Sequence, residues 1–305
     1  MMSANANIVI VGSLNMDLVA DSKRFPSEGE TIIGDKFEKY PGGKGANQAV
    51  AAARLGGSVS LIGCVGDDAH GHQLKNYLEK ENINTHSIFT VKDVNTGVAQ
   101  ISIAKKENKI IVVPGANYGL NLSMIKQSEP LIKQASVILL QLEIPMEIVA
   151  ETIRIAKDNN VPVILNPAPA LDIPTSILSD VSFITPNENE LAILTNTTLT
   201  SASNYEGTIK LLHNKGVDHV IVTRGEKGVL FSDNKIIQHA KSNKVDVVDT
   251  TGAGDTFNGA LAVALANSQS LYESVVFANK AAGISTTKGG AQTGMPVLEE
   301  VQKTN

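Results

Sequence analysis

Residues 248–266 read VDTTGAGDTFNGALAVALA. Two glycines flank the start of an alanine-rich run, and this pattern predicts a helix over residues 253–266 that begins directly at a flexible turn. The first N–H groups of such a helix, those of Ala253, Gly254 and Asp255, have no intrahelical partner and lie at the positive end of the helix dipole. The stretch is therefore either an anion site with an acid inside it or a turn before a buried helix.

Two common phosphate signatures are absent from this stretch. A dinucleotide-binding loop has a third glycine three residues after the second, and Phe257 stands at that position. A Walker loop needs Gly-Lys followed by Ser or Thr, and the chain contains no such tripeptide. The dinucleotide pattern is also missing after the first apolar run, IVIVGSLNMD at 8–17, which argues against a nicotinamide-dependent dehydrogenase.

The bulk composition favours a globular enzyme. The chain has 305 residues, 42% of them apolar, which suits one large α/β domain or two smaller ones. A net charge of −5 without a basic stripe argues against nucleic acid and membrane partners. Cys64 is the only cysteine, so an intramolecular disulfide and a cysteine metal cluster are excluded. The apolar run at 8–11 is too short for a signal segment or a membrane span, and we expect a cytoplasmic protein.

Short runs of Val, Ile and Leu alternate with helical patterns along most of the chain. This alternation predicts a parallel sheet with helices on both faces. The strand patterns stand at 7–13, 58–66, 135–143, 161–169, 181–188 and 219–231, and clear helical patterns at 42–56 and 70–82.

Two polar, β-rich stretches interrupt the alternation, at 18–43 and 96–117. Residues 99–113, AQISIAKKENKIIVV, predict a hairpin because two β-branched runs flank a charged turn. We expect one small sheet that projects from the core as a lid. Such a sheet needs a cover, either substrate or a second subunit. The expected division is a core of 1–16, 43–96 and 116–305 and a lid of 17–42 and 97–115.

Polar side chains follow the predicted strands, where ligands bind in open parallel sheets. Asn15 and Asp17 follow the first strand, and Glu143 follows a later one. Lys44 and Asn47 lie in the helix that a Gly-Gly pair begins, and that pair is equally well explained as a hinge. Carboxylates and amides at fixed points suit the hydroxyls of a neutral polyol. Each residue alone is also explained as a turn or cap.

Asp255 stands in the first turn of the helix at 253–266. An ionised carboxylate beside an anion site can take a proton from an attacking hydroxyl group. The N–H groups beside it would stabilise charge on a transferring phosphoryl group. The alternative is that Asp255 only caps the helix.

Together these segments resemble the ribokinase-like family of carbohydrate kinases, the phosphofructokinase B type, over nearly the whole chain. Residues 42–56, GGKGANQAVAAARLG, are similar to its N-terminal signature, and residues 249–262, DTTGAGDTFNGALA, to its C-terminal signature. NPAPA, TPNENE and GGAQTGMP resemble the ribokinase branch in particular. The resemblance implies a three-layer α/β/α core with a mostly parallel central sheet and a small projecting β-sheet lid.

The resemblance also implies a reaction, the transfer of the γ-phosphoryl group of ATP to the 5-hydroxyl of D-ribose with Mg²⁺ and an activating K⁺. Asp255 matches the general base, and Ala253 and Gly254 the anion hole. The positions that match the sugar site are Asn15, Asp17, Gly43, Lys44, Asn47, Ile101 and Glu143. Those that match the nucleotide and Mg²⁺ site are Asn187, Glu190, Thr223, Gly225, Gly228, Gly254 and Asn279. Those that match the K⁺ site are Asp249, Thr251, Ser285, Lys288, Gly290 and Gly294.

Family members pair through their lids, so the resemblance implies a homodimer. Asn279 stands where relatives carry His, and Lys288 where some carry Arg, which affects the details of adenine and ion contacts. The alternatives in the same family are fructokinase-like and adenosine kinase-like enzymes, because function resides in the site and not in the fold. A sugar sensor without catalysis is a further alternative, and the intact Asp255 argues against it.

Overall fold

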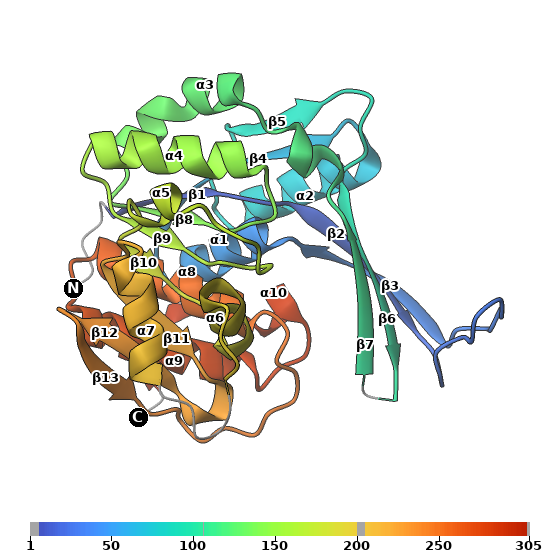
Figure 1. Ribbon diagram of the computed structural model, residues 1–305. Helices are drawn as coiled ribbons and strands as arrows, with labels where there is room; N and C mark the ends of the chain where they lie inside the picture. The colour runs from blue at the N-terminus through green and yellow to red at the C-terminus, as the bar shows by residue number, and fades with distance from the viewer. Residues whose placement is uncertain (1–5, 106, 200–204, 304–305) are drawn as a thin grey trace.

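A nine-stranded sheet runs through the centre of the molecule (Figure 1), and the computed structural model describes residues 6–105, 107–199 and 205–303. The strand order is β13-β12-β11-β10-β9-β8-β1-β4-β5, and every neighbouring pair from β11 to β5 is parallel. The strands are β1 (Asn7–Val11), β4 (Ser58–Gly66), β5 (Ile88–Val91), β8 (Val137–Leu140), β9 (Val163–Leu165), β10 (Phe183–Ile184), β11 (His219–Thr223), β12 (Val229–Asp233) and β13 (Ile236–Ala240).

Helices cover both faces of this sheet. Strand β1 shows why, since Ile8 and Ile10 belong to one buried cluster while Val9 and Val11 belong to the other. The first cluster includes side chains of α1 (Lys44–Arg54), α2 (Ala69–Lys80), α8 (Ala253–Ala266), α9 (Leu271–Ser285) and α11 (Leu298–Lys303). The second includes α3 (Leu122–Lys133), α4 (Met146–Asp158), α5 (Thr175–Leu178), α6 (Glu188–Thr195) and α7 (Tyr205–Asn214). The predicted three-layer core with a mostly parallel sheet is confirmed.

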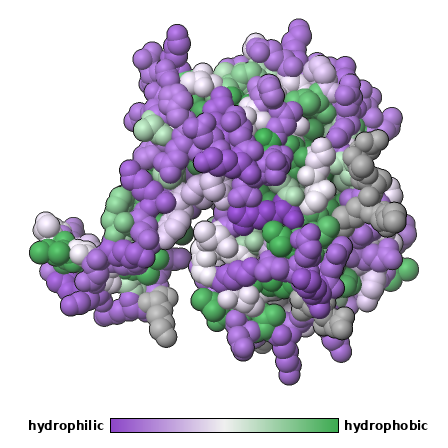
Figure 2. All heavy atoms as spheres, turned by 180° about the vertical axis from the view of Figure 1, so that it is seen from behind, coloured by the Kyte–Doolittle hydropathy of each residue, from purple (hydrophilic) through white to green (hydrophobic). Residues whose placement is uncertain are grey.

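A second, four-stranded sheet extends away from this core (Figure 1). Its strands are β2 (Asn15–Asp21), β3 (Lys36–Gly42), β6 (Gly97–Ala104) and β7 (Glu107–Val113), in the order β3-β2-β6-β7. Strands β6 and β7 pair antiparallel, as the hairpin pattern predicts, whereas β2 and β6 run parallel. Figure 2 shows an open cleft between this small sheet and the core. The small sheet is therefore exposed on the side that faces the cleft.

Two parts of the fold differ from the sequence-based expectation. Residues 219–231, read as one strand, form β11 and the antiparallel strand β12, because Gly225 and Gly228 with φ of 54° and 78° reverse the chain between them. Strand β5 was not predicted; only two of its four residues, Ile88 and Val91, are aliphatic, and Thr90 is exposed. Along the described chain, no helix combines the length and the apolar character that crossing a membrane requires.

Candidate active site

Helix α8 begins at Ala253, as the opening stretch predicts. Gly252 precedes it in the left-handed region, with φ of 76°. The turn lets the N–H of Ala253 donate to the carbonyl of Thr250 at 3.2 Å, so the prediction that this N–H is free is wrong. The N–H groups of Gly254 and Asp255 have no backbone acceptor among the described residues. A Cβ at Gly254 would meet no atom within 4 Å, so an anion has room to approach these two groups.

The Asp255 carboxylate is buried, with 8% of the residue exposed. Its two oxygens accept hydrogen bonds from α1: Oδ2 from Asn47 Nδ2 at 2.9 Å and Oδ1 from Gln48 Nε2 at 3.0 Å. The side chain caps no N–H of its own helix, where Gly252 is the N-cap residue. The geometry therefore rejects the alternative that Asp255 is only a helix cap.

Four other charged groups lie within electrostatic reach of Asp255 or of one another. They are the carboxyl groups of Asp17, Glu143 and Glu190 and the ammonium group of Lys44. Burial, and then the charges of Glu143 and Asp255, raise the pKa of Asp17 to about 7. Burial alone lowers the pKa of Lys44, but the charges of Asp255, Glu143 and Glu190 reverse this and raise it. Burial also raises the pKa of Glu190, against the opposing effects of a backbone hydrogen bond from Asn187 and the charge of Lys44. The site concentrates negative charge around the Lys44 ammonium group.

The residues that match the sugar site come from four segments, which are β2, the start of α1, β6 and the loop after β8. Glu143 Oε2 accepts from Ser13 Oγ at 2.5 Å and from the Lys44 N–H at 3.2 Å. These bonds join the loop after β8 to the start of α1. Gly43 has φ of 90°, and a Cβ there would lie 2.7 Å from the N atom of Asn15, so only glycine fits.

Three members of this set, Asn15, Asp17 and Ile101, lie on the small sheet. Asp17 is on β2, and a Cβ at Gly42 would clash with its carboxylate. Ile101 is a half-buried residue of β6 that pairs with Val19 and Ile110. The small sheet thus carries predicted sugar residues, and one of them, Asp17, is within electrostatic reach of Glu143 and Asp255.

Most of the residues that match the nucleotide site lie at or after the ends of β10 and β11, and Gly254 and Asn279 lie on α8 and α9. Asn187 and Glu190 form a reciprocal capping box at the start of α6, with both side chain to backbone distances at 2.9 Å. The Thr223 N–H donates to the carbonyl of Pro186, so the two loops are adjacent. Asn279 on α9 donates to the carbonyl of Lys241 at 2.8 Å. Gly228 lies beside this segment, because a Cβ added at Gly228 would clash with the carbonyl oxygen of Ala240.

Asp249 binds two of the other residues that match the cation site, Thr251 and Gly290. Its carboxylate accepts from the N–H and hydroxyl of Thr251, at 2.9 and 2.7 Å, and from the N–H of Gly290 at 2.8 Å. Partial burial alone raises the pKa of Asp249, but these bonds outweigh it and hold the pKa below its usual value. A Cβ at Gly294 would lie 2.8 Å from the carbonyl oxygen of Ser285 and 3.5 Å from that of Lys288. The Gly294 N–H donates to the carbonyl of Gly290 at 3.2 Å, so these two carbonyl oxygens lie within one turn of the residue whose N–H binds Asp249.

Several buried polar residues at the site were not predicted. Gln48 contacts Asp255 directly, and Gln292 Nε2 donates to Asn47 Oδ1 at 2.8 Å. Asn117 donates to Asn15 Oδ1 at 2.7 Å and so fixes the start of β2. Gln48 and Gln292 do stand within the quoted 42–56 and GGAQTGMP segments. Burial of a glutamine on a helix face marks it as a candidate site residue. The sequence alone does not show which glutamines are buried.

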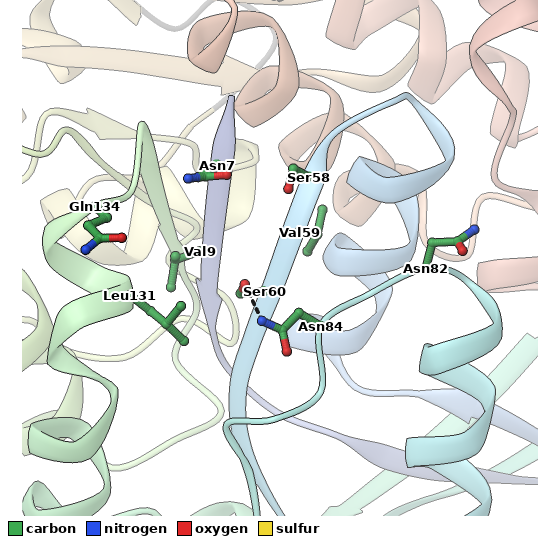
Figure 3. A pocket seen from close by; sticks show the side chains of 9 residues that line it. All are labelled: Asn7, Val9, Ser58, Val59, Ser60, Asn82, Asn84, Leu131 and Gln134. Atoms are coloured by element: carbon green, nitrogen blue, oxygen red, sulfur yellow. Dashed lines mark hydrogen bonds between the residues drawn. The ribbon is translucent and has the colours of Figure 1, made fainter. Parts of the chain in front are cut away.

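A separate hollow of about 310 Å³ lies at the other end of the sheet (Figure 3). It is lined near the starts of β1 and β4 by Asn7, Val9, Ser58, Val59 and Ser60, and Ser60 accepts from Asn84 there at 3.2 Å. None of the described residues that line it carries a charge. Its lining therefore does not offer the acid, base and anion-binding groups that surround Asp255.

Comparisons with known proteins identify the family of the chain. The model of the pfkB family of carbohydrate kinases matches residues 5–298. The ribokinase of Haemophilus influenzae is 42% identical over 294 residues, 96% of each chain. A deoxyribokinase of Salmonella typhimurium is 36% identical over 96% of this chain and 97% of its own. The structure of Arabidopsis thaliana ribokinase complexed with ribose and ATP superposes with a TM-score of 0.92 at 34% identity, covering 97% of both chains. The chain belongs to the pfkB family of carbohydrate kinases and is a sugar kinase.

Proposed function

We propose that this enzyme transfers the γ-phosphoryl group of ATP to the 5-hydroxyl of D-ribose, giving D-ribose 5-phosphate and ADP. The observation that carries the proposal is the buried Asp255 carboxylate, which lies in the first turn of α8 beside the N–H groups of residues 254 and 255, for which the described chain offers no backbone acceptor. Hydroxyl-binding amides and carboxylates from α1 and the small sheet surround it. The Haemophilus and Arabidopsis relatives, which carry the name ribokinase, support ribose as the acceptor.

In the proposed reaction the sugar oxygen forms a bond to the γ-phosphorus while the bond from phosphorus to the ADP oxygen breaks. The hydroxyl proton passes to Asp255, whose oxygens keep free lone pairs beside the bonds from Asn47 and Gln48. The N–H groups at the start of α8 stabilise the charge on the transferring group. Lys44, held positive by three nearby carboxylates, adds a cation to the same space.

Two ions fit the donor sets present. Mg²⁺ prefers oxygen ligands and phosphates, and Glu190 with Asn187 would hold it, since they supply a carboxylate and an amide oxygen and Glu190 interacts electrostatically with Lys44 and Asp255. K⁺ would occupy the cradle of Asp249, Thr251 and the carbonyls near Gly294. When bound, such cations neutralise phosphate charge and fix the anion-hole loop. ATP itself would lie along the loops that contain Thr223, Gly225, Gly228 and Asn279.

The small sheet is proposed to close over the sugar and to pair with a second copy of the chain. Strand β7 is an edge strand, and all its residues are exposed, including Ile110, Ile111, Val112 and Val113. Figure 2 shows hydrophobic side chains on this extension. Exposed apolar residues on an unpaired edge favour a partner, and a symmetric homodimer would cover them.

The test includes a second acceptor, 2-deoxyribose, because a deoxyribokinase is also a full-length relative. The experiment measures ADP formation with Mg-ATP and K⁺ for D-ribose, 2-deoxyribose, D-fructose and adenosine. The proposal predicts the highest kcat/KM for ribose. A higher value for any of the other three acceptors would contradict the choice of substrate while leaving the family intact.

A further inference from the structure

A row of buried amides lies directly behind the Asp255 carboxylate. Gln48, fully buried on α1, donates from Nε2 to Asp255 Oδ1 and to Asn166 Oδ1, each at 3.0 Å. Its Oε1 accepts from Nε2 of Gln141 at 2.6 Å, and Gln141 is fully buried as well. Both amide hydrogens and the carbonyl oxygen of Gln48 are therefore engaged, and its side chain has one orientation.

The chemistry of the partners fixes which way the amide points. An ionised carboxylate can only accept hydrogen bonds, so the nitrogen of Gln48 must face Asp255. Its oxygen then needs a buried donor, and Gln141 supplies one. The row thus transmits the position of the loop after β8 to the carboxylate, through two side chains that are not among the predicted sugar or nucleotide residues.

Backbone packing sets the distances in this row. A Cβ at Gly259, one turn after Asp255, would lie 2.7 Å from the backbone oxygen of Gln48, so α8 and α1 touch at this point. A Cβ at Gly12 would clash with Gln141 Oε1. Gln48 and Gln141 therefore fit because glycine stands at positions 259 and 12. Gln48 lies on a helix, and Gln141 lies directly after a strand.

We propose that Gln48, supported by Gln141, is a positioning residue for the reaction. It holds Asp255 Oδ1 so that the carboxylate keeps one rotamer toward the acceptor hydroxyl. Asn47 holds the other oxygen from the sugar side. A neutral amide fixes the carboxylate without cancelling its charge, which a base must keep. The inference rests on the proposed function, because it assigns a role in proton transfer to Asp255.

The test replaces Gln48→Met, which preserves size and removes all three hydrogen bonds. We expect kcat to fall about 10- to 100-fold, since a misplaced catalytic group costs that much. Sugar and nucleotide Kd values, measured by calorimetry, should change by less than about threefold, below about 0.7 kcal/mol. Gln141→Met should lower kcat in the same way but less. Thr152→Val, which removes a fully buried hydroxyl on α4, across the sheet, is the matched control and should leave kcat unchanged.

A double-mutant cycle separates positioning from general damage. In an Asp255→Asn background, Gln48→Met should cause almost no further loss of turnover, because the group that it positions has gone. A Gln48→Met enzyme with kcat close to wild type, or with the loss in sugar Kd instead of kcat, would overturn the proposal. If Gln48→Met fails to fold, the same two criteria apply to Gln141→Met.

The proposed function is tested separately. If the wild-type enzyme phosphorylates none of the acceptors, the function fails before any Gln48 variant is measured. If Asp255→Asn turns over like wild type, the base assignment fails. When wild type is active and Asp255→Asn is not, positioning by Gln48 is contradicted by either of the two outcomes given for Gln48→Met, a kcat close to wild type or a loss in sugar Kd instead of kcat.

Discussion

Asp17→Asn should make the unliganded protein more stable at alkaline pH. The pKa of Asp17 rises from 3.8 to about 7, first through burial and then through the charges of Glu143 and Asp255. The folded state therefore binds a proton that the unfolded chain has lost between about pH 4 and 7, and stability falls as pH rises through this window. At about 1.36 kcal/mol for each pKa unit, ionised Asp17 destabilises the fold above pH 7 by up to roughly 4 kcal/mol.

Asparagine has nearly the same shape and carries no charge, so it removes this penalty. Urea unfolding of both proteins from about pH 4.5 to 8.5, without sugar, measures the difference in unfolding free energy. The difference should be small at the acidic end and should grow in favour of the Asp17→Asn variant until about pH 8. Asp21→Asn, on the same strand, is the control for losing one aspartate. A difference that stays constant with pH would refute the electrostatic reasoning.

Three further predictions concern the ligand sites. Gly254→Ala should leave Tm near that of wild type, because a Cβ there meets no other atom, but it should lower kcat at least about tenfold by crowding the anion hole. The control is Gly283→Ala on α9, where a Cβ also meets no other atom, and it should leave kcat unchanged. Asp249→Asn should bring the ratio of rates in K⁺ and Na⁺ toward one, and an unchanged ratio above one would argue against the cradle. Ile111→Lys on β7 should yield monomers in sedimentation velocity where wild type gives dimers, and dimers in both would exclude this edge.

Local patterns were sufficient for most of the fold. The predicted helix at 253–266 has the same bounds in the structure, and the strand at 58–66 is β4 without change. Both contain an apolar run and have a glycine at a boundary. Val and Leu continue on both sides of the break between β11 and β12, so the prediction joined the two strands. The two glycines of RGEKG at 224–228 are themselves a turn signal, and the positive φ angles at Gly225 and Gly228 show the reversal.

The site was predicted less completely than the fold. Asp255 and Asn47 stood out because they lie beside glycines at helix starts, and the structure does join them, at 2.9 Å. Gln48 and Gln141 are 93 positions apart and touch only because α1, α8 and β8 pack together. A buried amide on an apolar face carries no local signature, so its partners could not be read from the sequence.

The most direct test of the account is the turnover of Asp255→Asn with ribose and Mg-ATP, measured beside its ribose affinity. Asn keeps the size of the side chain and its place in α8 but cannot accept the hydroxyl proton. The account predicts a fall in kcat of about 10²- to 10⁴-fold, the range for a lost general base, with ribose still bound and the protein folded by circular dichroism. Turnover within a few-fold of wild type would contradict the assignment of Asp255 as the base.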